Sequence, residues 1–368
     1  MRKIERQKMY KNKLSFFSLL MVMCLVSNAL FGQLLKVGIA GLSHDHVNGI
    51  MRQYKNGEVL IAGIAEGDQA IVDRIRKKFQ IPDSLFYKDL PSMLKSVKPD
   101  IVMAFNAIAE HLPVVETCAP LGIPVMVEKP LATTVKDANR MASLANQYHI
   151  KLLTNYETTW YSSNQQIYEM VNGQKLIGEI GKMIVHSGHQ GPKEIGCSAD
   201  FLNWLTDPVK NGGGAVVDFG CYGANLMTWL MNGKAPISVS AVLKHIKPDV
   251  YPKVDDDATI LLEYPGAIGI IEASWNWPFG IKDMEVFGKK GYLHALNGNN
   301  IEQRDTDKYY KVEVKPYIYR DYLSYISAVL KGDVNNSNDL SSLENNLIVV
   351  RILEAARQSA ATGKKIVL

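Results

Sequence analysis

The sequence is poor in cysteine, with four among 368 residues. Cys24 lies in an N-terminal segment, which leaves Cys118, Cys197 and Cys221 for the rest of the chain. The spacing of these three fits no metal-binding motif, and an odd number cannot all pair internally. We expect Cys118 to be a small apolar residue of a buried helix. A Cys197–Cys221 disulfide is permitted in an oxidising compartment but is not required.

An excess of positive charge is also missing once the N-terminal segment is set aside. Residues 1–32 carry six basic residues and one acidic residue, a net charge of +5, whereas the whole chain has +4. The remaining residues therefore have a net charge of −1. This balance gives no reason to expect nucleic acid or an anionic membrane as a partner.

No apolar run is long enough for a typical membrane span. The apolar stretch 14–26 follows a basic segment and leads through small and polar residues to Gly32 and Gln33. This layout is typical of a secretory signal peptide. We predict cleavage near Gly32/Gln33, export to the periplasm, and a mature chain without a membrane span.

Short apolar runs alternate with helical patterns up to about residue 154. Strands are expected at 35–40, 59–65, 100–105, 125–127 and 151–154, and helices at 46–54, 69–79, 110–121 and 134–148. This alternation predicts a parallel sheet covered on both faces, a doubly wound Rossmann domain at 33–154.

After residue 155 the strands become longer and are joined by short turns. A helix at 165–171 precedes strands at 182–187, 237–245, 258–264 and 268–277, and helices at 321–330 and 343–362 precede a closing strand at 364–368. The pattern predicts an α/β domain at 155–368 with a large, open, mostly antiparallel sheet. The C-terminal helices and strand are candidates to pack back on the Rossmann domain.

The first strand-to-helix turn has features of a dinucleotide-binding turn. Gly41 supplies the tight bend, Ser43 stands where backbone approaches a pyrophosphate, and His46 replaces the small third residue. We predict that this turn binds the cofactor, through Gly41, Leu42, Ser43, His44 and His46, with N–H groups at the helix N-terminus holding phosphate. Glu66, 25 residues after Gly41, is placed to accept hydrogen bonds from ribose hydroxyls and to favour NAD over NADP.

Glu128-Lys129-Pro130 closes the buried run 122–127, at the edge of the sheet where ligands bind. A lysine there can exchange protons if burial or a neighbouring cation lowers its pKa. With the turn at 38–46 and the stretches 105–111 (FNAIAEH) and 212–222 (GGGAVVDFGCY), the chain resembles the Gfo/Idh/MocA family of nicotinamide-dependent oxidoreductases. The resemblance covers residues 34–368 and implies a Rossmann domain, a second domain built on a large sheet, and a homodimer or homotetramer.

The resemblance also implies roles for individual residues. Lys129 matches the lysine near the nicotinamide and the reacting carbon, Glu128 a residue that contacts cofactor, and Asn106 and His111 the loop beside the nicotinamide. Asp218 and Tyr222 are expected on one helix face, because they are four residues apart. Tyr222 stands where many relatives have histidine. We expect Lys129 to lower the pKa of Tyr222, so that the two share the proton transfer, while Asp218 positions Lys129 or binds a sugar hydroxyl.

Other side chains are assigned from the segments that should border the cleft. Tyr156, Trp160, His189, Asp218 and Tyr222 are predicted substrate contacts, with His186, Trp204 and Asp207 as further candidates. Trp275 and Trp277 are expected on a strand, in sheet packing or subunit contacts. A metal held by His44, His46 and His111 is the less economical interpretation, so no metal is predicted.

Together these features predict an exported NAD-dependent oxidoreductase that acts on a secondary hydroxyl of a sugar, cyclitol or glycoside. Export favours a tightly bound NAD that is recycled within each catalytic cycle, because free NAD is not regenerated outside the cytoplasm. Two alternatives stay open: a glycoside hydrolase that uses transient oxidation, and a non-catalytic carbohydrate-binding protein that retains the fold.

Overall fold

The N-terminal strands form one parallel sheet, as predicted. The computed structural model describes residues 34–334 and 336–368, so the predicted signal peptide and its cleavage site lie outside the described residues. The strands pair in the order β3-β2-β1-β4-β5-β6, which is the order of a classic dinucleotide-binding sheet. Their bounds are β1 Lys36–Ala40, β2 Leu60–Ala65, β3 Phe86–Tyr87, β4 Ile101–Ala104, β5 Val125–Glu128 and β6 Leu152–Asn155.

The strand order changes direction between β1 and β4, since β1 pairs with β2 on one side and with β4 on the other. Ligands bind outside the carboxyl ends of the strands at such a point. The helices that cover this sheet are α2 Val47–Lys55, α3 Gln69–Phe79, α4 Leu90–Ser96, α5 His111–Cys118 and α6 Val135–Tyr148, with short turns η1 Asp83–Leu85, η2 Ile108–Glu110 and η3 Ala119–Leu121. The short elements η1, β3 and α4 were not predicted.

The second sheet has nine strands in the order β14-β13-β12-β11-β7-β10-β9-β8-β15. All its neighbours are antiparallel except β7 and β10, which run parallel. One face is buried, and in β9 buried and exposed residues alternate. The bounds are β7 Ile180–Gly188, β8 Ser238–Lys244, β9 Asp257–Tyr264, β10 Ala267–Ser274, β11 Ile281–Gly288, β12 Gly291–Asn297, β13 Asn300–Arg304, β14 Tyr309–Val312 and β15 Ile366–Val367.

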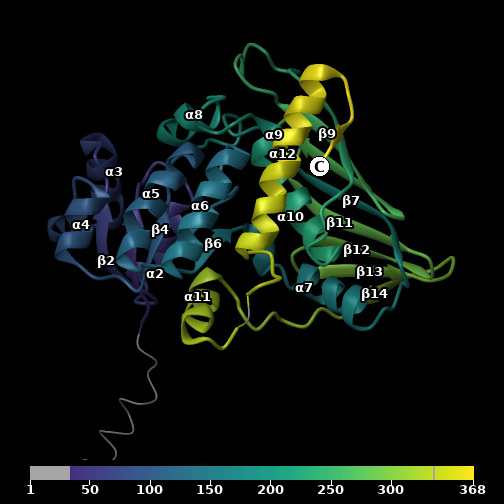
Figure 1. Ribbon diagram of the computed structural model, residues 1–368, viewed down its shortest axis with the longest axis horizontal. Helices are drawn as coiled ribbons and strands as arrows, with labels where there is room; N and C mark the ends of the chain where they lie inside the picture. Colours follow the sequence, from purple (N-terminus) through teal and green to yellow (C-terminus); the bar gives the residue numbers. More distant parts are fainter. Residues whose placement is uncertain (1–33, 335) are drawn as a thin grey trace, which may run out of the picture. The chain divides into compact units, whose positions relative to one another are not determined.

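Helices cover the buried face of this sheet (Figure 1). Every residue of α10 (Gly220–Leu230) is buried. The long helix α12 (Leu343–Thr362) packs against α10 and β8 and also against α6 of the first sheet, so it joins the two halves. The remaining elements are η4 Glu157–Trp160, α7 Ser162–Tyr168, η5 Glu169–Gly173, α8 Ala199–Leu205, α9 Ala215–Asp218 and α11 Tyr322–Lys331.

Two local expectations are wrong. Asp218 and Tyr222 do not share a helix, because α9 ends at Asp218 and α10 begins at Gly220 after the break at Phe219. Trp275 is not on a strand, because β10 ends at Ser274. Strands β11 to β14 and helix α8 were also missed.

The three cysteines of the described part of the chain are free thiols, so the permitted Cys197–Cys221 disulfide is not formed. Cys118 is fully buried, as expected for an apolar core residue. Among residues 34–334 and 336–368, no helix combines the length and apolar character that a membrane crossing needs.

Candidate active site

Gly41 makes the bend between β1 and α2 that opens the crevice. Its φ is +78°, and a Cβ there would lie 2.6 Å from Cβ of Asn106, so a side chain would fill the space between the ends of β1 and β4. The Gly41 amide donates to the Ala65 carbonyl, and the His44 amide donates to that of Phe105. The turn is therefore held against both neighbouring strands.

The turn offers fewer open amides than we expected. The Leu42 amide donates to Glu66 Oε2 at 2.9 Å and the His46 amide to His44 Nδ1 at 3.1 Å. Within the described residues, the Ser43 and Asp45 amides have no such partner. Leu42 is thus removed from the predicted phosphate contacts, because its amide is engaged and its side chain is buried.

Glu66 stands at the end of β2, as predicted. Its two carboxylate oxygens accept the Leu42 and Asp68 amides, each at 2.9 Å. Burial raises the pKa of Glu66 above its ordinary value. Each carboxylate oxygen has a second lone pair, so the side chain can still accept a hydroxyl while it holds the glycine turn.

A cavity of about 400 Å³ lies at the carboxyl ends of β1, β2 and β4, lined among others by Gly41, Ser43, Glu66, Asp68, Asn106 and Trp204. Two buried polar atoms of the neighbouring loop, Asn106 Oδ1 and His111 Nε2, have no hydrogen-bond partner among residues 34–334 and 336–368. His111 is fully buried with Nδ1 at 3.1 Å from the Leu131 carbonyl, and burial lowers its pKa to about 4. These features fit a bound dinucleotide, because buried polar atoms normally have partners.

Lys129 follows β5 and forms a buried ion pair with Asp218, the last residue of α9. Lys129 Nζ lies 2.5 Å from Asp218 Oδ1 and 2.9 Å from the Asp218 carbonyl, and Trp275 Nε1 donates to Asp218 Oδ2 at 3.0 Å. Burial alone lowers the pKa of Lys129, but Asp218 outweighs this effect and holds that pKa above its ordinary value. Burial likewise raises the pKa of Asp218, and Lys129 overrides it. The lysine is therefore an ammonium group beside a carboxylate.

The three glycines before α9 explain how Asp218 reaches this place. A Cβ on Gly214 would lie 1.7 Å from the Asp255 carbonyl oxygen, so only glycine fits. The Asp255 carboxylate accepts the Gly214 and Val216 amides at 2.8 and 2.7 Å, and its carbonyl accepts the Ala215 amide at 3.0 Å. Asp255 thus anchors the start of α9. This contact also positions Asp218, because Asp218 is the last residue of this short helix.

Tyr222 lies next to Lys129, but not as we expected. Lys129 Nζ is 5.0 Å from the centre of the Tyr222 ring, a cation–π position. Within the described residues, its hydrogen bonds go to Asp218. Burial raises the pKa of Tyr222 well above its ordinary value. The expected lowering of that pKa by Lys129 is wrong, because burial of the hydroxyl outweighs the nearby cation.

The other predicted substrate residues divide into three groups. Trp160 lines a second cavity, and His189 packs edge-on against Phe219 at 4.8 Å, beside the Lys129–Asp218 pair. Tyr156 is fully buried behind Tyr222 with the rings 5.6 Å apart, so it supports Tyr222 and is not open to a ligand.

The three further candidates lie elsewhere. Trp204 lines the first cavity, and Asp207 accepts the Val209 and Lys210 amides within its own loop. His186 is on the opposite, open face of the second sheet, where it pairs with Asp283 at 2.7 Å. His186 is therefore not a cleft residue, because strand residues alternate between faces.

Three residues at the site were missed by sequence reasoning. Trp275 holds Asp218, as described above. Lys282, from β11, lies with Nζ 4.9 Å from the centre of the Tyr222 ring and forms a close ion pair with Glu157. No sequence signal marks these contacts, because each joins segments at least 57 residues apart.

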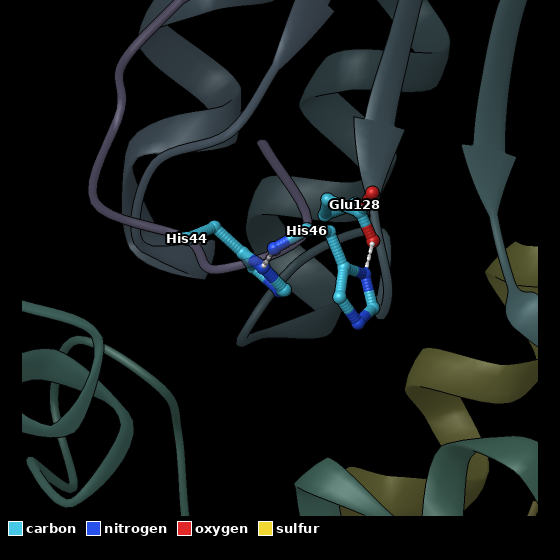
Figure 2. Close-up of side chains that lie close together, drawn as sticks. All are labelled: His44, His46 and Glu128. Atoms are coloured by element: carbon cyan, nitrogen blue, oxygen red, sulfur yellow. Dashed lines mark hydrogen bonds and ion pairs between the residues drawn. The ribbon is translucent and has the colours of Figure 1, made fainter. Parts of the chain in front are cut away.

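His44, His46 and Glu128 come together at the glycine turn (Figure 2), with one potential ligand atom of each within 4.8 Å of the others. The metal site considered from the sequence had His111 as its third ligand, whereas the structure has Glu128 in that place. Hydrogen bonds already account for the arrangement: His46 Nδ1 lies 2.9 Å from Glu128 Oε2, and His44 Nδ1 accepts the His46 amide. Burial lowers the pKa of His44 well below its ordinary value, so this ring is neutral.

A parallel sheet with this strand order and a cavity at the carboxyl ends of β1, β2 and β4 is typical of a dinucleotide-binding domain. Family models agree: the oxidoreductase family with NAD-binding Rossmann fold matches residues 35–156, and the GFO/IDH/MocA C-terminal domain matches residues 164–294. The two matches together span more than half of the chain, and the protein belongs to the GFO/IDH/MocA family.

Curated relatives are distant. D-xylose 1-dehydrogenase [NADP(+)] of Haloarcula marismortui is 24% identical over 197 residues, 53% of each chain. Trans-1,2-dihydrobenzene-1,2-diol dehydrogenase of Mus musculus is 22% identical over 229 residues, 62% of this chain and 64% of the relative. The aligned part thus spans about half to two thirds of these relatives.

Solved structures share the fold along nearly the whole chain. The aldose-aldose oxidoreductase from Caulobacter crescentus, complexed with glycerol, has a TM-score of 0.76 at 22% identity and covers 91% of this chain and 100% of its own. The inositol dehydrogenase homolog from Azotobacter vinelandii, complexed with NAD+, has a TM-score of 0.77 at 16% identity and covers 92% and 98%. At these identities the likeness establishes the fold alone.

Proposed function

We propose that the protein is an exported oxidoreductase that acts on a secondary hydroxyl of a sugar, cyclitol or glycoside, with tightly held NAD. The buried Lys129–Asp218 pair beside Tyr222 carries this proposal. The names of the relatives support the substrate class, since they include a xylose dehydrogenase, an aldose-aldose oxidoreductase and an inositol dehydrogenase homolog. Glu66 supports NAD, because a carboxylate repels a 2′-phosphate.

The cofactor, when bound, accepts a hydride from the alcohol carbon or returns one to a carbonyl carbon. Gly41, Ser43, Glu66, Asn106 and His111 are the residues that would hold it. His44 is buried against Trp204, with ring centres 5.4 Å apart, and supports the turn from behind.

Lys129 is the residue that meets the reacting oxygen in this proposal. An ammonium group has three N–H donors, and two of them are directed at Asp218. The third is available to a substrate oxygen. Because the pKa values of Lys129 and Tyr222 are both raised, the resting site holds these groups in their protonated forms and is set to protonate a carbonyl oxygen.

A pH dependence follows from these directions. Oxidation of an alcohol needs Lys129 or Tyr222 to lose its proton first, so its kcat/KM should rise with pH across the neutral and alkaline range. The kcat/KM for reduction of the ketone should be independent of pH near neutrality and then fall as the pH approaches the raised pKa values of Lys129 and Tyr222. A kcat/KM for oxidation that falls above neutral pH would contradict this assignment.

The direct test is native mass spectrometry of the purified protein for bound NAD(H), followed by turnover assays with aldoses, cyclitols and nitrophenyl glycosides. Lys129→Ala should retain NAD and lose about 10²–10⁴-fold in turnover, the usual contribution of a general acid–base group. Lys182→Ala, on an exposed position of β7, is the matched control. A protein that binds no NAD, or a Lys129→Ala variant with near-normal turnover, would refute the proposal.

A further inference from the structure

Four side chains form one hydrogen-bonded chain beside the proposed site. His46 Nδ1 lies 2.9 Å from Glu128 Oε2, Asn155 Nδ2 lies 2.9 Å from Glu128 Oε1, and Trp160 Nε1 lies 3.1 Å from Asn155 Oδ1. The members come from the start of α2, the ends of β5 and β6, and η4. Four separate elements thus converge on one line of contacts.

The donor and acceptor of each hydrogen bond in this series follow from two groups whose roles are fixed, the Trp160 indole and the Glu128 carboxylate. The Trp160 indole can only donate, so Asn155 Oδ1 accepts and Asn155 Nδ2 donates to Glu128. Glu128 is 1% exposed, and although burial raises its pKa, His46 outweighs this and holds the pKa below its ordinary value. The carboxylate is therefore ionised and can only accept, which makes His46 Nδ1 the donor.

In the tautomer that carries its proton on Nδ1, the imidazole has Nε2 as an acceptor. Figure 2 shows this second ring nitrogen of His46 pointing away from Glu128. Nε2 has no hydrogen-bond partner in the described chain. The His46 side chain is 43% exposed, whereas that of Glu128, its partner on the Nδ1 side, is only 1% exposed. The ring is thus held from its buried side and open on the other.

The open side of His46 faces a cavity of about 310 Å³, lined by Asp45, His46, Gly49, Arg52, Glu128, Asn155, Glu157, Trp160 and Tyr322. Two lining residues connect this cavity to the proposed centre: Glu128 precedes Lys129 in the chain, and Glu157 pairs with Lys282, which lies 4.9 Å from the Tyr222 ring centre. A lining that combines an indole with carboxylate and imidazole acceptors suits a sugar ring, which has apolar C–H faces and hydroxyl donors at its rim.

We propose that His46 Nε2 accepts a hydrogen bond from a hydroxyl group of the sugar substrate other than the one oxidised, and that Glu128, Asn155 and Trp160 are positioning residues that hold His46 in this tautomer. The inference rests on the proposed function for the identity of the ligand, but the tautomer does not. In this proposal the side chains of His46 and Glu128, which the sequence assigned to the cofactor, belong to the substrate side of the site.

The tautomer can be measured in the protein without substrate. ¹⁵N-resolved NMR of the histidine rings at alkaline pH, assigned with His46→Asn, should show His46 protonated on Nδ1. Glu128→Gln should reverse it: the new amide has the same shape, its oxygen accepts from Asn155, and its nitrogen donates to His46 Nδ1, so the proton moves to Nε2. A wild-type ring protonated on Nε2, or a tautomer unchanged in Glu128→Gln, would overturn the inference.

The ligand is tested separately with D-glucose, myo-inositol and whichever aldose the turnover screen finds best. In Glu128→Gln, Nε2 becomes a donor, so the sugar hydroxyl can no longer donate to it and must turn to accept, which disrupts its other hydrogen bonds. KM for the sugar should therefore rise about 10-fold, while the Kd for NAD changes less than about twofold. Glu116→Gln, on an exposed face of α5, is the matched control.

Three outcomes would overturn this second part. An equal loss of affinity for NAD would assign the imidazole to the cofactor. An unchanged KM, or a best substrate whose monodeoxy analogues all keep its kcat/KM, would show that His46 reads no hydroxyl. If no sugar is turned over or bound, the proposed function fails, whereas the tautomer result stands or falls on the NMR spectra alone.

Discussion

Replacing Asp218 by asparagine isolates the energy of the buried ion pair. Asp218 and Lys129 have side chains only 8% and 6% exposed and lie 2.5 Å apart. The amide is nearly the same size, and its oxygen can still accept from Trp275 Nε1. Its NH2 group then faces Lys129, so the variant removes both the compensating charge and the acceptor of this lysine. Removing one partner of a buried pair costs about 3–5 kcal/mol because it leaves an uncompensated charge. We expect a loss of about 3 kcal/mol at neutral pH, since the freed lysine can lower its cost by giving up its proton.

The pH dependence of this loss follows from the pKa directions. In the wild type, the lowered pKa of Asp218 contributes stability that is present above the ordinary carboxyl value and is lost as pH falls through the folded value. The raised pKa of Lys129 contributes stability that is present below the ordinary lysine value and is lost as pH rises through the folded value. The contribution of the Lys129–Asp218 pair to the free energy of unfolding is therefore constant across neutral pH. In Asp218→Asn, burial lowers the pKa of Lys129, so the penalty is full between the pH at which Asp218 titrates in the wild type and this lowered lysine pKa, and it shrinks as pH rises above that value.

Urea unfolding at several pH values measures both effects, with the slope compared between variants. The double variant Lys129→Met/Asp218→Asn is the control, because replacing a buried pair by groups without charge is often nearly neutral. It should be more stable than Asp218→Asn although it carries one more substitution. A loss below about 1 kcal/mol in the single variant, or a penalty that grows as pH rises above neutral, would refute the reasoning.

Two further predictions concern the second domain. Gly214→Ala should destabilise the protein by more than about 3 kcal/mol in thermal unfolding, because its Cβ would lie 1.7 Å from the Asp255 carbonyl oxygen. Gly181→Ala is the control, since the nearest atom to a Cβ there is 3.8 Å away. Equal losses of stability in the two variants would contradict the packing argument. Asp283 raises the pKa of His186 and has its own pKa lowered to about 2. The His186 contribution is present below its ordinary pKa of about 6.5 and is lost as pH rises through the folded value. Asp283→Asn should therefore destabilise most at mildly acidic pH, and denaturant midpoints that differ equally at acidic and alkaline pH would contradict this sign.

The Rossmann half could be predicted in detail because its signals are local. Apolar runs bounded by turn residues placed the major strands to within a few residues, and Gly41, Glu66 and Lys129 each follow a strand end that the pattern alone defines. Such positions depend on strand order and not on distant packing.

The second domain was less predictable because its site depends on contacts between distant segments. Asp218 and Tyr222 looked like one helical face, but Asp255 anchors α9 from outside and the helix breaks at Phe219. The pKa of Tyr222 depends on burial that no sequence pattern measures. Lys282 could not be found either, since its role depends on which face of β11 turns toward Tyr222.

The position of β7 in the second sheet has a consequence for how the chain folds. β7 is the first strand of that sheet in the sequence, yet it lies between β10 and β11, which begin at Ala267 and Ile281. One edge therefore waits for a segment about 80 residues further along and the other for a segment about 90 residues further along, and contacts of such separation form slowly. An apolar strand with two unpaired edges invites pairing with other chains. The most aggregation-prone moment in the life of this protein should come after β7 is made and before β10 and β11 close on either side of it.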